Sequence, residues 1–422
     1  MTGSDLVPTS PSTGEPFDWL QLAFVDVLGN ARSLEVPGAC FDEAVRTGVV
    51  FDGSALEGPA RYLEVDMRLQ AQPGTLIDLG QGRARVIGAV LTTGGRPWRG
   101  DPRAALAEVL DDLPAVLDGC TVAAELEFYL LDGEGQPVDG GAYFEDVGGL
   151  GPRVVRDASD ALQGYGVEVV GCHHEAGPGQ YEIDLGPTSP LAMADALVVA
   201  KHTIRRVARL AGLTATFMAS PPGGGSGSGL HLHQRADALM TPTDGALTDA
   251  GRGFVAGQLA HARALSALAA PNVNSYRRLN SGAEAPSAAI WGYSNRAALI
   301  RVARDLGPQS SIEFRGADPA ANPYLLLTGL LATGADGVQG DLELPAANDE
   351  QFGTFEPASA VRFEPLPRHL DEALDALVAD EVVTDAFDPL LVEILVTGRR
   401  AEVQEYRSRT TSWEVERYLT EA

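Results

Sequence analysis

Two glutamates, Glu125 and Glu127, lie two positions apart in an apolar run that has the composition of a buried strand. Side chains at positions i and i+2 of a strand point to the same face, so we expect both carboxylates to emerge together. Two buried carboxylates repel each other unless they are protonated or bridged by a cation. A glutamate pair alone is usually solvated, but the apolar neighbours of this pair favour a metal site.

A second acidic segment spans residues 173–182 and begins with two histidines. It carries Glu175 and Glu182, which are separated by a Gly-Pro-Gly sequence that permits a tight reversal of the chain. A hairpin would bring both carboxylates to one site. Taken alone, the segment is equally compatible with a polar loop that carries incidental acids.

Two further segments add imidazole and carboxylate ligands. His231 and His233 alternate on a predicted strand after the glycine-rich run 223–229, which on composition alone is a flexible linker, and Glu313 follows in another apolar run. Several carboxylates with one imidazole suit Mg²⁺ or Mn²⁺ better than Zn²⁺, which prefers four-coordinate N/S sites. Together the segments predict one divided cation site.

Five arginines between the histidine strand and the end of the last acidic segment form a basic series: Arg277, Arg278, Arg296, Arg301 and Arg315. Any one of them has surface salt bridging as its simplest explanation. The chain is strongly acidic, however, with a formal net charge of -27 and a single lysine, Lys201. An anionic substrate would therefore be bound by arginine, metal or backbone amides.

The bulk properties exclude several classes of protein. A net charge of -27 disfavours nucleic acid or an anionic membrane as the main partner. The three cysteines, Cys40, Cys120 and Cys172, have no paired spacing, which argues against a disulfide framework and favours a reducing cytoplasm. The start of the chain lacks the pattern of a signal peptide, and no apolar stretch is long enough to span a membrane.

The order of predicted elements indicates two domains of α+β type. Short strands and turns fill residues 19–87, and the stretch 92–101, rich in Gly, Arg and Pro, is the best linker. Beyond it we expect strands at 121–131 and 167–170, and helices at 192–211, 253–270, 323–338 and 366–380. Strands and helices do not alternate regularly, so a βαβ fold is not expected.

From about Trp19 to Leu419 the chain resembles the glutamine synthetase family, in particular its bacterial class and divergent glutamine-synthetase-like relatives. The motifs that carry the resemblance are Phe51-Asp-Gly-Ser54, Glu125-Leu-Glu127, the segment 173–182, Gly227-Ser-Gly-Leu-His-Leu-His233, Asn274-Ser-Tyr-Arg-Arg-Leu279, Glu284-Ala-Pro286, Asn295-Arg296 and the segment 312–324. The composition of residues 1–16, rich in Ser, Thr, Pro and Gly, predicts a disordered tail. The resemblance implies a small β-grasp domain at 17–98 and a large catalytic α+β domain at 99–422. It also implies a homo-oligomer, typically a dodecamer of two stacked hexameric rings.

The activity implied by the resemblance is an ATP-dependent ligation. The γ-carboxylate of glutamate, or a similar acid, would be joined to ammonia or a primary amine through a γ-glutamyl phosphate. Two or more Mg²⁺ or Mn²⁺ ions per subunit would assist. The implied ligand sets are Glu127, Glu175 and Glu182 for one ion, and Glu125, His231 and Glu313 for the other.

The resemblance also implies roles for residues that touch the substrates. The implied catalytic residues are Asp52, Glu284 and Arg296; the substrate-binding residues are Tyr143, Gly227, Arg278 and Arg315; and the ATP-binding residues are His233 and Arg301. Asp52 would be supplied by the adjacent subunit and would form the amine pocket with Tyr143 and Glu175, while Glu284 would close the site.

Several positions depart from the family pattern, among them Ser220, Ser226, Arg235 and the pair Ser310-Ser311. They fall in implied nucleotide and substrate contacts, whereas the metal ligands are intact. The pattern predicts a relative that uses another amine or another acid. A catalytically silent binding or regulatory homologue is the alternative, and a metal hydrolase that reuses the same carboxylates ranks third.

Overall fold

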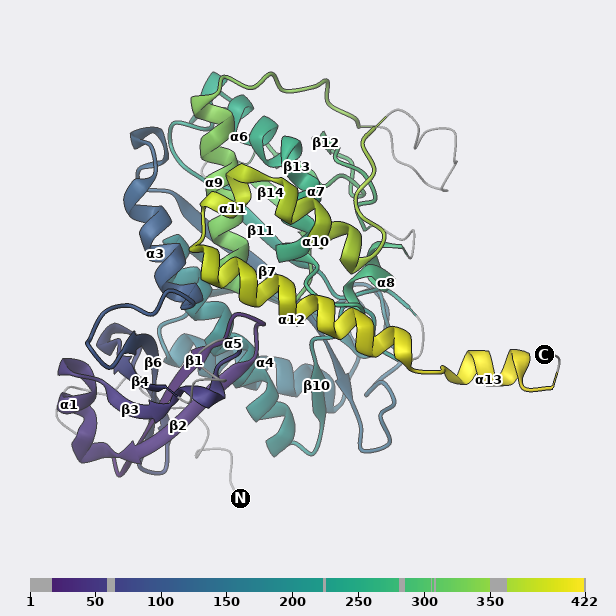
Figure 1. Cartoon of the computed structure of the whole chain (residues 1–422). Coiled ribbons are helices and arrows are strands. Elements are labelled where there is room, and N and C mark those ends of the chain that lie inside the picture. The colour runs from purple at the N-terminus through teal and green to yellow at the C-terminus, as the bar shows by residue number, and fades with distance from the viewer. Residues whose placement is uncertain are drawn as a thin grey trace.

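The computed structural model describes residues 17–58, 65–222, 225–280, 285–304, 306, 309–349 and 363–420 (Figure 1). The tail expected at 1–16 and the catalytic candidate Glu284 lie outside the described residues. The described part of the chain contains two separate sheets, one in each of the two domains expected from the sequence.

The smaller, N-terminal sheet has the strand order β2-β1-β6-β4-β3, with β5 also pairing with β6. Its elements are β1 (Trp19–Val25), β2 (Ala31–Pro37), α1 (Phe41–Arg46), β3 (Val49–Asp52), β4 (Asp66–Ala71), β5 (Ile77–Gly80) and β6 (Arg83–Thr92). Strand β1 runs antiparallel to β2 and parallel to β6. Leu20 and Leu22, two positions apart on β1, are fully buried, as expected for a strand that presents one apolar face to a core.

The larger sheet has the order β12-β13-β14-β11-β7-β9-β8, and β10 pairs with β7. Its strands are β7 (Thr121–Leu131), β8 (Val169–His174), β9 (Gln180–Thr188), β10 (Thr214–Thr216), β11 (Leu230–Arg235), β12 (Trp291–Gly292), β13 (Ile300–Ala303) and β14 (Ser311–Ala317). Strand β7 is flanked by the antiparallel strands β9 and β11. The predicted strand at 121–131 is therefore confirmed, and it lies near the centre of the sheet.

Helices pack around this sheet (Figure 1). They are α3 (Pro102–Asp112), α4 (Leu150–Gly164), α5 (Pro190–Leu210), α6 (Asp249–Ala260), α7 (Ala262–Ala269), α8 (Ser275–Leu279), α9 (Pro323–Gln339), α10 (Leu370–Ala379), α11 (Glu381–Asp385), α12 (Pro389–Ser408) and α13 (Ser412–Tyr418). Proline begins α3, α5, α9 and α12, where its missing N–H costs no hydrogen bond. Helix α5 packs against β7, β9 and β10.

Some predicted boundaries are wrong. The single helix expected at 253–270 is two helices, α6 and α7, that meet at His261. The strand expected at 167–170 begins at Val169 and continues to His174, and the helix expected from residue 366 begins at Leu370. None of the described helices is long and apolar enough to cross a membrane.

Candidate active site

The acidic and histidine segments come together because four neighbouring strands carry them. Strand β7 lies between β9 and β11, and β11 pairs in turn with β14. The residues that lie opposite one another in register are Glu127 with Glu182, Glu125 with His231, and His233 with Glu313. Antiparallel pairing therefore gathers side chains from positions far apart in the sequence.

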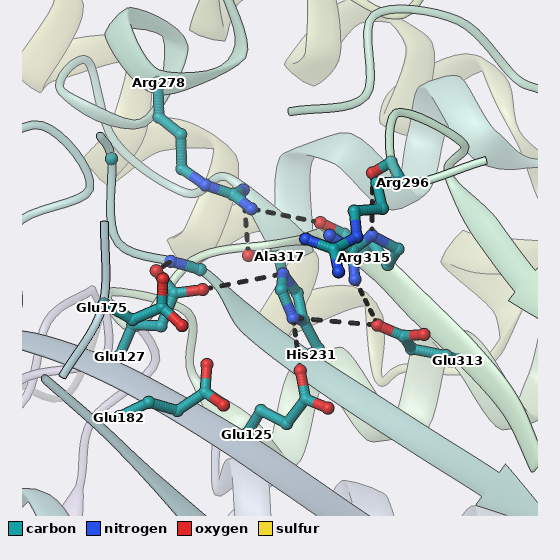
Figure 2. Close-up of polar contacts among 12 residues, drawn as sticks. Glu125, Glu127, Glu175, Glu182, His231, Arg278, Arg296, Glu313, Arg315 and Ala317 are labelled. Atoms are coloured by element: carbon teal, nitrogen blue, oxygen red, sulfur yellow. Dashed lines mark hydrogen bonds and ion pairs between the residues drawn. The ribbon is translucent and has the colours of Figure 1, made fainter. Parts of the chain in front are cut away.

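These side chains border a cavity of about 510 Å³. Its lining includes most of the site residues expected from the sequence: Glu125, Glu127, Glu175, Glu182 and His231, together with Tyr143, Gly227, Arg278, Arg296, Arg301 and Arg315. The shared face expected for Glu125 and Glu127 is confirmed, because both line the cavity, whereas Ala124 and Leu126 are buried in the core. Carboxylates thus form one wall, and guanidinium groups face them in Figure 2.

The carboxylate of Glu125 lies between two imidazoles. Its Oε2 is 2.7 Å from His231 Nδ1, and its Oε1 is 2.9 Å from His233 Nε2. His231 also lies 3.8 Å from Glu313 Oε1 and 3.9 Å from Glu127 Oε1 (Figure 2). Burial opposes ionisation, but hydrogen bonds with His231 and His233 outweigh it and place the pKa of Glu125 well below its ordinary value. Glu125 is therefore a carboxylate.

Glu313 is fully buried and pairs with two guanidinium groups, those of Arg301 and Arg315. Burial raises the pKa of the Glu313 carboxyl, but the charges of Arg315 and His233 lower it by more, so that the pKa lies below its ordinary value. A buried carboxylate is stable only when it is paired in this way. Glu313 therefore connects strand β11, which carries the histidines, with the arginines Arg301 and Arg315.

Glu182 belongs to a second group of ligand-type side chains. His173 Nε2 lies 3.2 Å from Glu182 Oε1, and His173 Nδ1 lies 3.6 Å from Glu175 Oε1. Burial, followed by repulsion from Glu125 and Glu127, raises the pKa of Glu182 far above its ordinary value. Excess negative charge is therefore concentrated around Glu182.

The donor set fits divalent cations of the Mg²⁺ or Mn²⁺ type. Two triplets each offer ligand atoms within 4.8 Å of one another: Glu125, His233 and Glu313, and His173, Glu175 and Glu182. Asp184 lines the same cavity, and its buried Oδ1 has no hydrogen-bond partner within the described part of the chain. Oxygen-rich sites with an occasional imidazole suit these cations.

The arrangement differs in two details from the ligand sets implied by the family resemblance. His233 completes the triplet with Glu125 and Glu313, while His231 lies closer to the middle of the carboxylate group and lines the cavity. His173 joins the other triplet, although the sequence motif assigned it no role. The register of β8 and β9 explains this, because His173 lies opposite Glu182.

The guanidinium groups of the opposite wall are held by backbone carbonyls. Arg278 donates from Nη1 to Ala317 O at 3.0 Å, and Arg315 donates from Nε to Arg296 O at 3.0 Å (Figure 2). Burial lowers the pKa of Arg278, against the attraction of Glu127. Fixed, buried guanidinium groups of this kind recognise carboxylate or phosphate groups.

Gln180 is a positioning residue that sequence reasoning missed. It is 1% exposed, and its Nε2 donates to Glu127 Oε2 at 2.9 Å and to Gly227 O at 3.1 Å. The backbone N–H of Gly229 donates to the same Glu127 oxygen at 2.9 Å. These bonds fix the orientation of Glu127. The Gly-Gln-Tyr-Glu motif contained the signal, but the partners of Gln180 lie more than 45 residues away and are visible only in three dimensions.

An aromatic rim lies beside the acidic wall. Tyr143 and Phe144 are exposed by 45% and 64%, and both rings contact His173, with centroids 5.8 and 4.4 Å away. Phe144 has a φ of 56°, a left-handed conformation that is unfavourable for an aromatic residue. The loop therefore holds Tyr143 at the cavity and Phe144 against His173, despite solvent exposure and backbone strain.

Two sequence candidates are not part of this wall. Asp52 is exposed, accepts a hydrogen bond from Ser54 N at 2.8 Å, and does not line the cavity of its own chain. That hydrogen bond lowers the pKa of Asp52. Glu284 lies outside the described residues, although its neighbour Ala285 lines the cavity.

Comparison with known proteins identifies the family. The models for the glutamine synthetase β-grasp domain and for the glutamine synthetase catalytic domain match residues 17–92 and 99–418, so the expected fold, a small β-grasp domain before a larger α+β catalytic domain, is confirmed. The chain is 36% identical to a glutamine synthetase of Thermotoga maritima, over 95% of this chain and 96% of the relative. It is 35% identical to one of Staphylococcus aureus, over 95% of both chains.

A solved structure described as a GmaS/ADP complex superposes with a TM-score of 0.83 and 28% identity, covering 96% of this chain and 97% of that one. A ligand-free GmaS structure gives a TM-score of 0.82, with the same identity and the same coverage. The chain therefore belongs to the glutamine synthetase family and is a ligase of that type, which forms a C–N bond.

Proposed function

We propose that this ligase joins the γ-carboxylate of glutamate, or of a closely similar acid, to ammonia or a primary amine with consumption of ATP. One observation carries the proposal: a single cavity has a wall of carboxylates opposed by a wall of arginines, of which Arg278 and Arg315 are buried. A cationic amine and divalent cations suit the first wall, and the anionic acid and phosphate groups suit the second. The reaction needs both kinds of ligand at one place.

The acid would be oriented by Arg278 and Arg315, whose guanidinium groups are already fixed by backbone carbonyls. Gly227 lies beside them, and a Cβ at this position would lie 2.6 Å from both Ala219 O and Arg278 Cγ. Only glycine therefore allows the backbone to pass so close to the arginine. The resulting site is rigid before the substrate arrives, which reduces the entropy lost on binding.

The nucleotide phosphates would lie against Arg296 and Arg301, with His233 behind them. Two divalent cations, held by the two carboxylate and histidine triplets, would screen the charge of the phosphates when bound. Arg296 is exposed at the cavity and has its side chain available for the transferring phosphoryl group. The description of the related GmaS structure as an ADP complex supports an adenine nucleotide as substrate.

The proposed ligation has two steps, phosphoryl transfer to the acid and displacement of phosphate by the amine. An oxygen of the γ-carboxylate attacks the terminal phosphorus of ATP, a new O–P bond forms, and the bond to ADP breaks. The amine nitrogen then attacks the acyl carbon, a C–N bond forms, phosphate leaves, and one N–H proton passes to a carboxylate. Glu175 lies at the cavity for this purpose, and Asp52 and Glu284 are the further candidates from the sequence.

The aromatic rim supports a primary amine with a carbon substituent as one acceptor. Tyr143 and Phe144 would offer apolar area to an alkyl group, and their π faces would attract an ammonium group before it loses its proton. Ammonia needs no such surface. The rim is the observation that favours an amine over ammonia.

The exposed position of Asp52 supports assembly of several copies, with the β-grasp domain of one copy completing the cavity of the next. A domain boundary near residues 98 and 99 agrees with the gap between the two matched segments, at 92 and 99. A closed ring satisfies such a head-to-tail contact for every copy.

An amine panel tests the proposal. Phosphate release would be measured with ATP, Mg²⁺ or Mn²⁺, glutamate, and ammonia, methylamine, ethylamine, ethanolamine or a polyamine. We expect release that depends on both the acid and the amine. Binding of ATP without phosphate release for any pair would instead support the catalytically silent homologue.

A further inference from the structure

A second, larger hollow lies along α5 and has the opposite electrostatic character to the protein as a whole. It encloses about 1570 Å³ and shares no lining residue with the candidate active site. Nine lysines and arginines line it, against two glutamates, in a chain with a net charge of -27. We call it the α5 groove.

Helix α5 supplies the central cations of the groove at helical spacing: Lys201, Arg205, Arg206 and Arg209. Residues four apart lie next to each other on one helix face, so Arg205 and Arg209 form a neighbouring pair with Lys201 one turn earlier. Strand β6 of the small domain adds Arg85 from the other side. The groove therefore lies between the small domain and α5.

Arg85 is built into the groove rather than placed on an open surface. It is 4% exposed, its Nη1 donates to Gln21 Oε1, and its Nε has no hydrogen-bond partner in the described part of the chain. The neighbouring His202 Nε2 is likewise buried without a partner there. Buried polar atoms without hydrogen-bond partners cost free energy unless a ligand satisfies them.

The acids of the groove leave this charge largely uncompensated. Glu402 pairs with Arg399 at 2.7 Å, and Glu405 pairs with Arg409. Arg205 lies over the Phe217 ring, 4.7 Å from its centroid. Among the described residues, no carboxylate forms an ion pair with Arg85, Arg205 or Arg209.

We propose that the α5 groove binds a small anion that carries two or more carboxylate or phosphate groups. Several guanidinium groups spaced along one helix match several negative groups, because each guanidinium group pairs with one carboxylate or phosphate. A monovalent anion would leave most of these cations unmatched. The volume exceeds that of a single phosphate several times over and suits a ligand of metabolite size.

The groove also touches the two segments that shape the active site. Ser220 lines the groove and exchanges two hydrogen bonds of 2.9 Å with Asn274, which precedes α8. On α8, Arg277 lines the groove and the next residue, Arg278, lines the active-site cavity. Anion binding is therefore expected to slow hydrogen exchange at residues 218–222 and 275–279 as well as on α5.

Calorimetric titration of the full chain in metal-free buffer with a chelator tests the proposal, with pyrophosphate and citrate as probes and acetate as the monovalent comparison. We expect pyrophosphate, citrate or both to bind, with an affinity that falls as salt rises, while acetate binds at least tenfold more weakly. R205Q/R209Q should weaken binding at least tenfold. The matched variant R156Q/R252Q removes two exposed arginines outside the groove and should change the affinity less than twofold.

The two probes distinguish a phosphorylated from a polycarboxylic ligand. R296Q separates the groove from the active site, because an anion that binds only in the active site would be lost in R296Q and retained in R205Q/R209Q. That result would overturn the proposal. So would the absence of binding together with a change in molar mass for R205E/R209E, which would make the groove a contact between copies.

Discussion

At the scale of single residues, two arginines with the same charge have different tasks. Arg315 is buried and pairs with the fully buried Glu313, whereas Arg296 is exposed at the cavity and contributes only its backbone carbonyl to the network. Removal of one member of a buried pair leaves the other uncompensated. Their substitution therefore separates folding from activity.

We expect R315A to lower the free energy of unfolding by about 3 kcal/mol, the usual cost of stranding a buried charge, and to abolish amide formation. R296A should leave the midpoint of urea unfolding unchanged, because its carbonyl remains to accept from Arg315. It should still reduce kcat by at least a hundredfold, the effect of losing one transition-state donor. Equal stability of both variants would contradict this division.

Gln180 gives a second prediction at this scale. It aligns Glu127 from behind, and loss of such a partner usually reduces metal affinity or activity by about 10–100-fold. We expect Q180A to raise the Mn²⁺ concentration needed for half-maximal activity within this range, and saturating Mn²⁺ should recover part of the rate. Q70A, on the small domain, removes a partly buried glutamine that bonds to Val45 O, and it should leave the Mn²⁺ requirement unchanged.

At the scale of elements, the sequence predicted those strands and helices that are determined by a local pattern of apolar residues. β7 was predicted with its bounds, since an apolar run with two acids on one face has the period of a strand. The break between α6 and α7 was missed, because the apolar pattern continues through it. His261 at the break binds Asp380 at 2.7 Å and Asp336 at 3.3 Å, both more than 70 residues away.

Contacts between residues far apart in the sequence also limited the prediction of the candidate active site. The acidic and histidine residues proposed as ligands were visible as residue types within motifs. In contrast, the contacts of Gln180, the place of His173 and the presence of His233 in the triplet with Glu125 and Glu313 depend on strand register. Register is set by pairing between strands distant in the sequence. Motif reasoning therefore finds the ligands more readily than the groups that orient them.

His261 makes a pH-dependent prediction. The hydrogen bond with Asp380 raises its folded-state pKa above 6.5, so its stabilisation is complete below the unfolded pKa and is lost as pH rises through the higher folded pKa. We expect H261A to cost about 1.5–3 kcal/mol at pH 6, the value of a charge-assisted bond, and clearly less at pH 9. Urea unfolding at both pH values measures this. The exposed H369A is the control, and an equal loss at both pH values would contradict it.

At the scale of the whole molecule, the cavity lies in the large domain, whereas the candidate residue Asp52 lies on the small domain. If neighbouring copies complete each other, the two parts of one active site come from different chains. The assembly is then a condition of activity as well as of stability.

Subunit complementation tests this division. D52A and R296A should each be inactive alone. Co-assembled at equal amounts, they should recover about a quarter of the wild-type activity, because random mixing unites two intact halves in one site out of four. No recovery in mixed assemblies would place Asp52 in the site of its own chain or outside the reaction.

Transfer of an oxygen atom from glutamate to phosphate is the direct test of an acyl-phosphate mechanism in this cavity. Glutamate labelled with ¹⁸O in its γ-carboxylate would be incubated with ATP, Mg²⁺ or Mn²⁺ and the best acceptor from the amine panel, and the phosphate and amide would be analysed by mass spectrometry. We expect one labelled oxygen in the released phosphate for each amide formed. Amide formation with unlabelled phosphate would contradict an acyl phosphate and the ligase mechanism assigned to this cavity.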